Sequence, residues 1–121
     1  MAQPRVLIVD DHAGFRSAAR RMLESEGFAV IGEAADAAAA ISAARTLNPD
    51  VVLLDVVLPD GNGFDVAEVL SADRANRAVV MISSRPASTY RARLARTAAN
   101  GFVFKADLSG QSIRDVTGDP R

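Results

Sequence analysis

The sequence contains no cysteine. Disulfide bonds, zinc sites built from thiolates and cysteine nucleophiles are therefore excluded. It also lacks the glycine-rich signatures of nucleotide binding, because no G-x-G-x-x-G pattern and no Walker loop follows any of the predicted strands. Neither internal repeats nor a low-complexity linker divide the 121 residues, and this length suits one domain. We therefore predict a single domain over residues 1–121.

A dominant charge and a long hydrophobic run are missing as well. The 14 basic and 15 acidic side chains leave a formal net charge of -1, which argues against a bulk electrostatic attraction to nucleic acid or to an anionic membrane. The first apolar run, Val6 to Val9, is too short for a signal peptide or a membrane span. We therefore expect a cytoplasmic protein, with no direct binding of nucleic acid or membrane by this chain.

Strand and helix signals alternate along the chain. Short apolar runs bounded by turn residues indicate buried strands, and apolar residues three and four positions apart indicate helices that cover them. The predicted strands are Arg5–Val9, Phe28–Glu33, Val51–Leu54, Ala78–Ile82 and Phe102–Phe104. The predicted helices begin at Ala13, Ala37, Phe64 and Pro86, with the fourth closing at Asn100, and a short or irregular last helix spans about 109–118. This repeat requires right-handed crossovers and an α/β fold, with a mostly parallel sheet and helices on both faces.

Polar side chains stand at the carboxyl ends of four of the predicted strands. They are Asp10 and Asp11, Asp55, Ser83 with Ser84, and Lys105. Because the carboxyl ends of parallel strands lie at one edge of the sheet, we expect these side chains to converge. Carboxylates held together repel one another unless a cation joins them, and Mg²⁺ commonly uses one or two carboxylates with water and a phosphate oxygen. We therefore predict a Mg²⁺ site at Asp10, Asp11 and Asp55.

The same residues have the components of phosphoryl transfer onto a carboxylate. The ammonium of Lys105 suits a phosphoryl oxygen, and a serine hydroxyl adds one more donor. A metal ion and this lysine would neutralise the equatorial oxygens while Asp55 attacks phosphorus in line. Taken alone, Asp55 would be interpreted as the cap of a turn, and the group as a surface cluster of ion pairs. Polar residues at four successive buried strand ends favour the phosphoryl-transfer interpretation.

This pattern resembles the receiver domain of two-component response regulators, which has a chemotaxis-regulator-like fold, over about residues 5–108. The family has an acidic pair after the first strand, the phosphorylated aspartate after the third, a serine or threonine after the fourth and a lysine after the fifth. The matching residues here are Asp10 and Asp11, Asp55, Ser83 and Lys105. The resemblance implies a flavodoxin-like, doubly wound five-stranded sheet with strand order 2-1-3-4-5. The segments Asp10-Asp11-His12 and Val30-Ile31-Gly32-Glu33-Ala34 resemble the subgroup whose members often carry a LuxR-type DNA-binding domain.

Further roles follow from the resemblance alone. Asp11 would be the direct metal ligand of the acidic pair and Asp10 would bind through water, while the backbone carbonyl of Val57 would be another ligand. Ser83 and Phe102 would form the switch, with Phe102 turning inward as Ser83 moves toward the phosphoryl group. Phe102 lacks the hydroxyl of the tyrosine often found at this position in the family.

The function implied by the resemblance is that of a response regulator. It takes a phosphoryl group from a histidine kinase or a histidine phosphotransfer protein onto Asp55, in a Mg²⁺-dependent step that it catalyses itself, and then changes its affinity for an output protein. It is not expected to be an enzyme that acts on a separate substrate. The alternatives are a phosphorylation-independent interaction module with the same fold, and a receiver fragment of a longer DNA-binding regulator. A phosphatase of the haloacid dehalogenase type is disfavoured, because Val57 stands where that family needs a second acid.

Two features outside this pattern have plainer interpretations. His12 follows the acidic pair, but Mg²⁺ prefers oxygen ligands, so we expect a loop histidine that faces the solvent. Arg91, Arg93 and Arg96 are expected to form the solvated face of a helix rather than a binding surface for an acidic partner.

Overall fold

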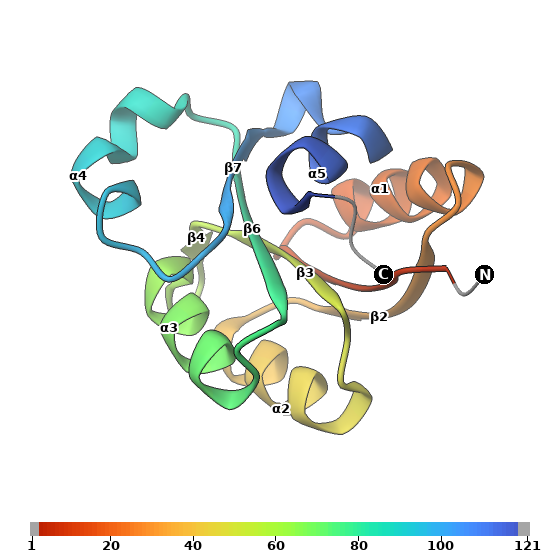
Figure 1. Ribbon diagram of the computed structural model, residues 1–121, viewed down its shortest axis with the longest axis horizontal. Coiled ribbons are helices and arrows are strands. Elements are labelled where there is room, and N and C mark those ends of the chain that lie inside the picture. Colours follow the sequence, from red (N-terminus) through yellow and green to blue (C-terminus); the bar gives the residue numbers. More distant parts are fainter. Residues whose placement is uncertain (1–2, 119–121) are drawn as a thin grey trace.

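In the computed structural model, which describes residues 3–118, parallel strands form one central sheet (Figure 1). The five strands are β1 (Arg5–Val9), β2 (Ala29–Ala34), β3 (Val51–Asp55), β6 (Ala78–Ser83) and β7 (Gly101–Phe104). Their order is β2-β1-β3-β6-β7. The strands β4 (Val57–Leu58) and β5 (Gly61–Asn62) are not part of this sheet and form a small separate hairpin. The predicted fold and strand order are confirmed. Residues 1–2 and 119–121, which the predicted domain includes, lie outside the described residues.

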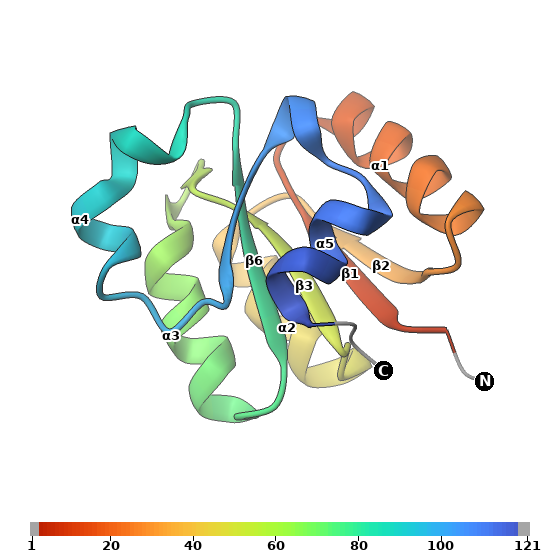
Figure 2. The same ribbon diagram turned by 45° about the horizontal axis from the view of Figure 1, so that its top comes forward.

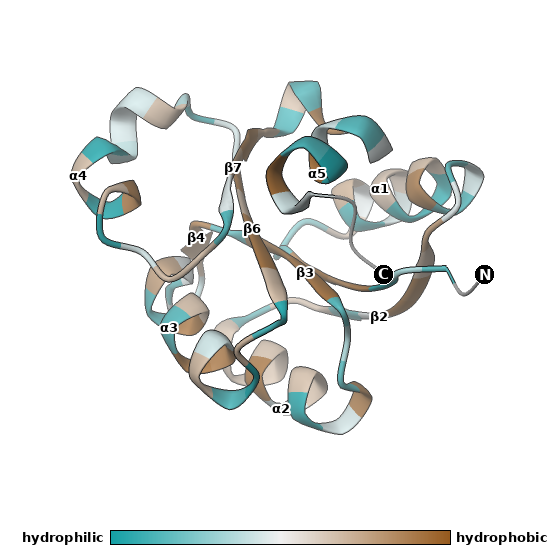
Figure 3. Cartoon of the chain, in the orientation of Figure 1, coloured by the Kyte–Doolittle hydropathy of each residue, from teal (hydrophilic) through white to brown (hydrophobic). Residues whose placement is uncertain are grey.

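Helices cover both faces of the sheet, as predicted (Figures 1 and 2). One face carries α1 (Ala13–Ser25) and α5 (Gly110–Thr117), and the other carries α2 (Ala37–Leu47) and α3 (Gly63–Asp73). Each face has its own hydrophobic core. Every residue of β3 and β6 is buried, which explains why these strands are almost continuous apolar runs instead of alternating patterns. In Figure 3 the central strands are accordingly coloured as mostly hydrophobic.

Polar side chains cap the starts of two helices. Asp36 precedes α2, and its side chain accepts the backbone N–H of Ala39 at 2.7 Å. Ser109 precedes α5, where its side chain and that of Ser112 form a capping box. Such caps satisfy backbone donors that have no partner inside the helix. The last helix is therefore regular at its start, although it has only 8 residues.

The loop after β3 is tied to α2 by a contact that the sequence did not reveal. The carboxylate of Asp60 accepts the backbone N–H groups of Ala37 and Ala38, at 2.6 and 3.1 Å. These donors belong to the first turn of α2, where N–H groups lack intrahelical partners, and their hydrogen bonds lower the pKa of Asp60. Because Asp60 lies between β4 and β5, this contact attaches the chain segment that follows Asp55 to the start of α2.

The helix predicted after Pro86 is much shorter than expected. The structure has a 3₁₀ turn and one short helix, which are η1 (Ala87–Tyr90) and α4 (Arg91–Leu94). The cause is tertiary hydrogen bonding, because Glu68 of α3 accepts the N–H of Ala98 at 2.8 Å. Asn100 also donates its N–H to the carbonyl of Val79 at 2.8 Å, and its side chain accepts the N–H of Val79 at 2.9 Å. These partners occupy backbone groups that a continued helix would pair internally.

None of the helices in the described residues combines the length and the apolar character that crossing a membrane requires. The longest, α1, has 13 residues, whereas a transmembrane helix needs about 20.

Gly63 begins α3 directly against the end of β3. Its N–H donates to the carbonyl of Val56 at 2.7 Å, and a side chain at this position would overlap the backbone carbonyl oxygen of Asp55. Gly63→Ala should therefore displace the backbone at Asp55 and lower the free energy of unfolding by about 1–3 kcal/mol, the usual cost of overpacking. Urea unfolding of the variant and the wild type measures this loss.

Gly14→Ala is the matched control for this prediction. It lies in α1, and no atom lies within 4 Å of the methyl group that the substitution adds. Alanine also forms helices better than glycine, so this variant should be as stable as the wild type or more stable. Equal stability of the two variants would contradict the close approach of Gly63 to Asp55.

Candidate functional site

The carboxyl ends of β1, β3, β6 and β7 lie at one edge of the sheet, the upper edge in Figure 2. A cavity of about 240 Å³ opens at this edge. It is lined by Asp11, His12, Asp55, Val57, Ser83, Ser84, Arg85, Tyr90 and Lys105. Asp10 is fully buried beside the cavity and forms an ion pair with Lys105, which lines it. The structure therefore brings together every residue that was predicted at the strand ends, while their functional roles stay predictions.

Lys105 lies between two buried carboxylates. Its Nζ donates to Oδ2 of Asp55 at 3.1 Å and forms an ion pair with Oδ2 of Asp10. The same ammonium lies 4.6 Å from the centre of the Phe15 ring, which adds a cation–π contact. Lys105 is the only lysine in the sequence, where the remaining basic residues are arginines. A compact ammonium fits between two carboxylates at a site where a planar guanidinium would need more room.

Burial and the shared lysine shift the pKa values of this group in different directions. Burial raises the pKa of Asp55 above its usual value and the charge of Asp10 adds to the rise, although the Val57 N–H and Lys105 offset part of it. Burial also acts to raise the pKa of Asp10, but the contacts from Lys105 and His12 outweigh it, so this pKa is lowered. Burial disfavours the charged form of Lys105, yet the two carboxylates prevail and raise its pKa. Lys105 therefore stays positively charged at neutral pH.

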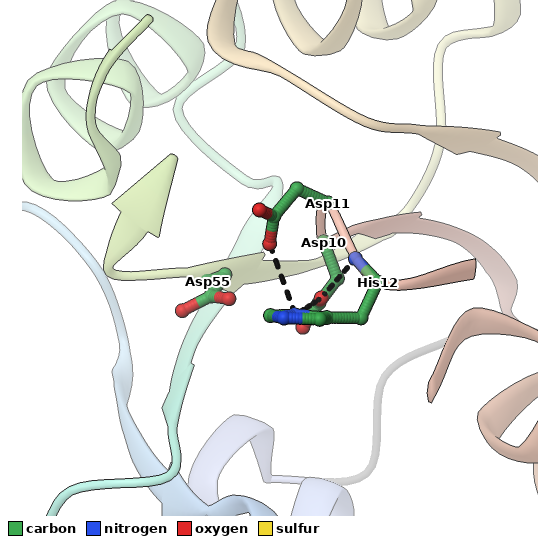
Figure 4. A group of neighbouring side chains, drawn as sticks. All are labelled: Asp10, Asp11, His12 and Asp55. Carbon is green, nitrogen blue, oxygen red and sulfur yellow. Dashed lines mark hydrogen bonds and ion pairs between the residues drawn. The ribbon is translucent and has the colours of Figure 1, made fainter. Parts of the chain in front are cut away.

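The acidic pair and His12 form a compact group that faces Asp55 (Figure 4). Nδ1 of His12 lies 3.1 Å from Oδ1 of Asp10 and 3.0 Å from Oδ1 of Asp11. The backbone N–H of His12 also donates to Oδ1 of Asp10 at 2.8 Å. The side chain of His12 is 72% exposed, as expected for a loop residue. It nevertheless bends back over the two carboxylates, which the sequence did not indicate.

These residues fit a divalent cation. One ligand atom each from Asp10, Asp11, His12 and Asp55 lies within 4.8 Å of the others. Oδ2 of Asp10 is buried and accepts no hydrogen bond from the described residues, although it is paired with the charge of Lys105. Carboxylate oxygens are the ligands that Mg²⁺ prefers. Val57 lines the same cavity, and its backbone carbonyl stays the further ligand that the family resemblance implies.

Ser83 is buried at the end of β6, and none of the hydrogen bonds among the described residues joins its hydroxyl to Asp55. Its Oγ accepts the backbone N–H of Arg85 at 3.0 Å and lies 3.2 Å from the hydroxyl of Tyr90. Phe102, the predicted switch residue, is partly buried on β7, and its ring centre lies 6.2 Å from that of Tyr90. The sequence pattern assigned Tyr90 no functional role. The sequence feature that could have suggested this contact is that the single tyrosine of the chain follows Ser83 by 7 residues.

Fold and site together define a class of protein. A flavodoxin-like α/β domain with an acidic, lysine-containing cavity at the carboxyl edge of its sheet has the architecture of a signal receiver. Residues 6–114 match the family model of the response regulator receiver domain, and the chain belongs to this family. It is thus a receiver domain of two-component response regulators, a family outside the conventional enzymes. The resemblance stated from the sequence is confirmed.

Relatives and solved structures support the same assignment. The chain is 36% identical over 101 residues to BvgA of Bordetella pertussis, a virulence-factor transcription regulator, and this match covers 84% of the chain and 48% of BvgA. A LuxR-family two-component response regulator from Aurantimonas sp. SI85-9A1 has a TM-score of 0.86 and 28% identity, covering 97% of this chain and 86% of that one. The signal receiver domain of the response regulator NarL from Mycobacterium tuberculosis has a TM-score of 0.84 and 28% identity, covering 98% of this chain and all of that one.

These relatives confirm the predicted similarity to the LuxR-type subgroup. The chain spans about half the length of the curated relatives that it matches. The activity and partners of those whole proteins therefore enter only as proposals.

Proposed function

We propose that this receiver domain accepts a phosphoryl group on Asp55 from a histidine kinase or a histidine phosphotransfer protein, in a Mg²⁺-dependent step promoted by its own residues. The observation that carries the proposal is the position of Lys105, whose ammonium touches both Asp55 and Asp10 at the edge of an open cavity. A carboxylate that ends the central buried strand, beside a fixed cation and with room in front of it, suits a nucleophile for phosphorus.

The charges of the site favour a divalent cation and an anionic substrate. Asp10, Asp11 and Asp55 contribute three negative charges and the Lys105 ammonium one positive charge, so these four residues carry a formal excess of two negative charges. Arg85 also lines the cavity but makes no ion pair with them. A divalent cation held by Asp10, Asp11, Asp55 and the Val57 carbonyl would neutralise this excess. When bound, Mg²⁺ supplies positive charge to the phosphoryl oxygens.

The residues of the chain then have defined roles in the transfer. A carboxylate oxygen of Asp55 forms a bond to phosphorus while the bond between phosphorus and the donor nitrogen breaks, and the electron pair leaves with the imidazole. Lys105 neutralises charge on the phosphoryl oxygens, and Ser83 donates a hydrogen bond to one of them after it turns toward Asp55. Hydrolysis reverses the modification when water attacks phosphorus and Asp55 leaves as a carboxylate.

The output of the domain is the other part of this proposal. The match to this chain covers about half of each of the transcription regulators among its relatives. We therefore propose that the phosphorylated domain controls a transcription regulator, either as part of a longer polypeptide or through binding to a separate protein. A cytoplasmic location, expected from the sequence, agrees with such a partner.

Labelling by a small phosphodonor tests the proposal. Acetyl phosphate with Mg²⁺ should add one base-labile phosphoryl group to the wild-type protein without a kinase, which intact-mass spectrometry measures. Removal of Mg²⁺ by a chelator should abolish this labelling, because the charge excess at the site would be uncompensated. Asp11→Ala should raise the Mg²⁺ concentration needed for half-maximal labelling, since it deletes the exposed ligand. A wild type that stays unlabelled with Mg²⁺ present would instead favour the phosphorylation-independent interaction module.

A further inference from the structure

Tyr90 connects the two residues of the predicted switch. Its hydroxyl lies 3.2 Å from Oγ of Ser83, so a hydrogen bond joins the end of β6 to the turn η1. Its ring packs against two others, with centre distances of 5.9 Å to Phe64 and 6.2 Å to Phe102. Ser83 and Phe102 therefore both contact one side chain, which also lines the cavity in front of Asp55.

The hydrogen bonds of Ser83 hold its hydroxyl toward η1. Oγ accepts the N–H of Arg85 at 3.0 Å and is paired with the hydroxyl of Tyr90. In the described part of the chain no hydrogen bond joins Ser83 to Asp55. To donate to a phosphoryl group on Asp55, Ser83 has to leave this arrangement, and the Ser83–Tyr90 hydrogen bond is then lost.

The segment that carries Tyr90 is suited to move when this bond breaks. Turn η1 and helix α4 have only 4 residues each, and neither contains a buried residue. Short 3₁₀ turns with poor hydrogen-bond geometry and few buried contacts are among the parts of a protein that rearrange most easily. Displacing the Tyr90 ring would also open the space beside Phe102.

We propose that Tyr90 is a positioning residue that holds Ser83 away from Asp55 in the unphosphorylated domain, and that its release couples phosphorylation to movement of η1, α4 and Phe102. This inference rests on the proposed function of Asp55.

The protein contains its own reporter for this movement. Tyr90 is the only tyrosine and there is no tryptophan, so the intrinsic fluorescence at tyrosine wavelengths comes from this residue. Beryllofluoride with Mg²⁺, which occupies the place of a phosphoryl group on a carboxylate, should change the emission of the wild type. Ser83→Ala should show changed emission without any ligand, because its Tyr90 hydroxyl has lost its partner. Wild-type emission that is the same with and without beryllofluoride would overturn the inference.

A second measurement isolates the hydroxyl of Tyr90. Tyr90→Phe keeps the ring and removes one hydrogen bond of the unphosphorylated state, so beryllofluoride should bind this variant about two- to tenfold more tightly than the wild type, the range expected for one neutral hydrogen bond. Titrations followed by the amide resonances of Gly101 and Phe102 give these affinities. In a Ser83→Ala background the gain should vanish, because the bond that Tyr90→Phe removes is already absent.

Thr89→Val is the control, since it deletes a neighbouring exposed hydroxyl of η1 that makes no hydrogen bond with any of the described residues. It should leave the affinity for beryllofluoride unchanged. Labelling of the wild type by acetyl phosphate separates the inference from the function on which it rests. An unlabelled wild type would overturn both, whereas a labelled wild type with equal beryllofluoride affinity in Tyr90→Phe would overturn the inference alone.

Discussion

Asp55→Asn should abolish phosphoryl labelling by acetyl phosphate while leaving the fold intact. Asparagine has nearly the size of aspartate but lacks the charged oxygen that attacks phosphorus. The substitution should not reduce stability at neutral pH, because burial raises the pKa of Asp55 and the charged carboxylate is therefore a cost to the folded state. Intact-mass spectrometry measures the label, and circular dichroism with urea unfolding measures the fold.

Asp65→Asn is the matched control for this substitution. Its carboxylate is 78% exposed on α3, and within residues 3–118 its one ion pair is with Arg93, at 3.3 Å. The same chemical change there should leave labelling at the wild-type level. If Asp55→Asn took up one phosphoryl group as the wild type does, the acceptor would be another residue, and Asp11 would be the next candidate because it lines the same cavity.

Lys105→Met should lower the stability of the domain by about 3 kcal/mol at neutral pH without Mg²⁺, because removing one partner of a buried ion pair leaves its charge uncompensated. Methionine keeps most of the length of the lysine side chain but carries no charge, so the loss reports on the ion pairs of the ammonium and its cation–π contact with Phe15. Asp10 and Asp55 would then face each other with no cation between them. Urea unfolding measures the loss, and added Mg²⁺ should recover part of it.

The pH dependence of this variant has a defined sign. Without the ammonium, burial and mutual repulsion should raise the pKa values of both carboxyl groups in the folded state above their unfolded values. A group with a raised folded pKa binds a proton more readily when folded, so the missing stability should return as the pH falls toward those values. In the wild type the lowered pKa of Asp10 has the opposite effect on the pH dependence of stability. The contribution of Asp10 to the free energy of unfolding is present above its unfolded pKa and is lost as the pH falls.

Arg93→Met is the control for the charge change. Its pair with Asp65 is exposed on both sides, and such pairs contribute little to stability. This variant should unfold like the wild type and show no recovery with Mg²⁺. A Lys105→Met protein as stable as the wild type at neutral pH would contradict the electrostatic account of the site.

The sequence alone was enough to predict the strands of the sheet and the residues that meet at the site. Strands buried on both faces have to be continuous apolar runs, so Val51–Leu54 and Ala78–Ile82 were recognisable without any knowledge of their neighbours. In the structure each of these strands is one residue longer and includes the polar residue at its end, Asp55 or Ser83. Parallel topology then requires that residues at the ends of the strands converge, which brought Asp55, Ser83 and Lys105 together in advance of the structure. Local caps such as Asp36 were also predictable, because donor and acceptor lie within one turn.

Only the tertiary structure decided the features that depend on partners far apart in the chain. The segment after Pro86 has a helical pattern, but Glu68 and Val79 bind its backbone and shorten the helix. Asp60 reaches the start of α2 across 23 residues, and Tyr90 meets Ser83 only because the chain turns at η1. Periodicity reports which face of an element is apolar, whereas these hydrogen bonds depend on the distance between elements after they have packed, which no local pattern contains.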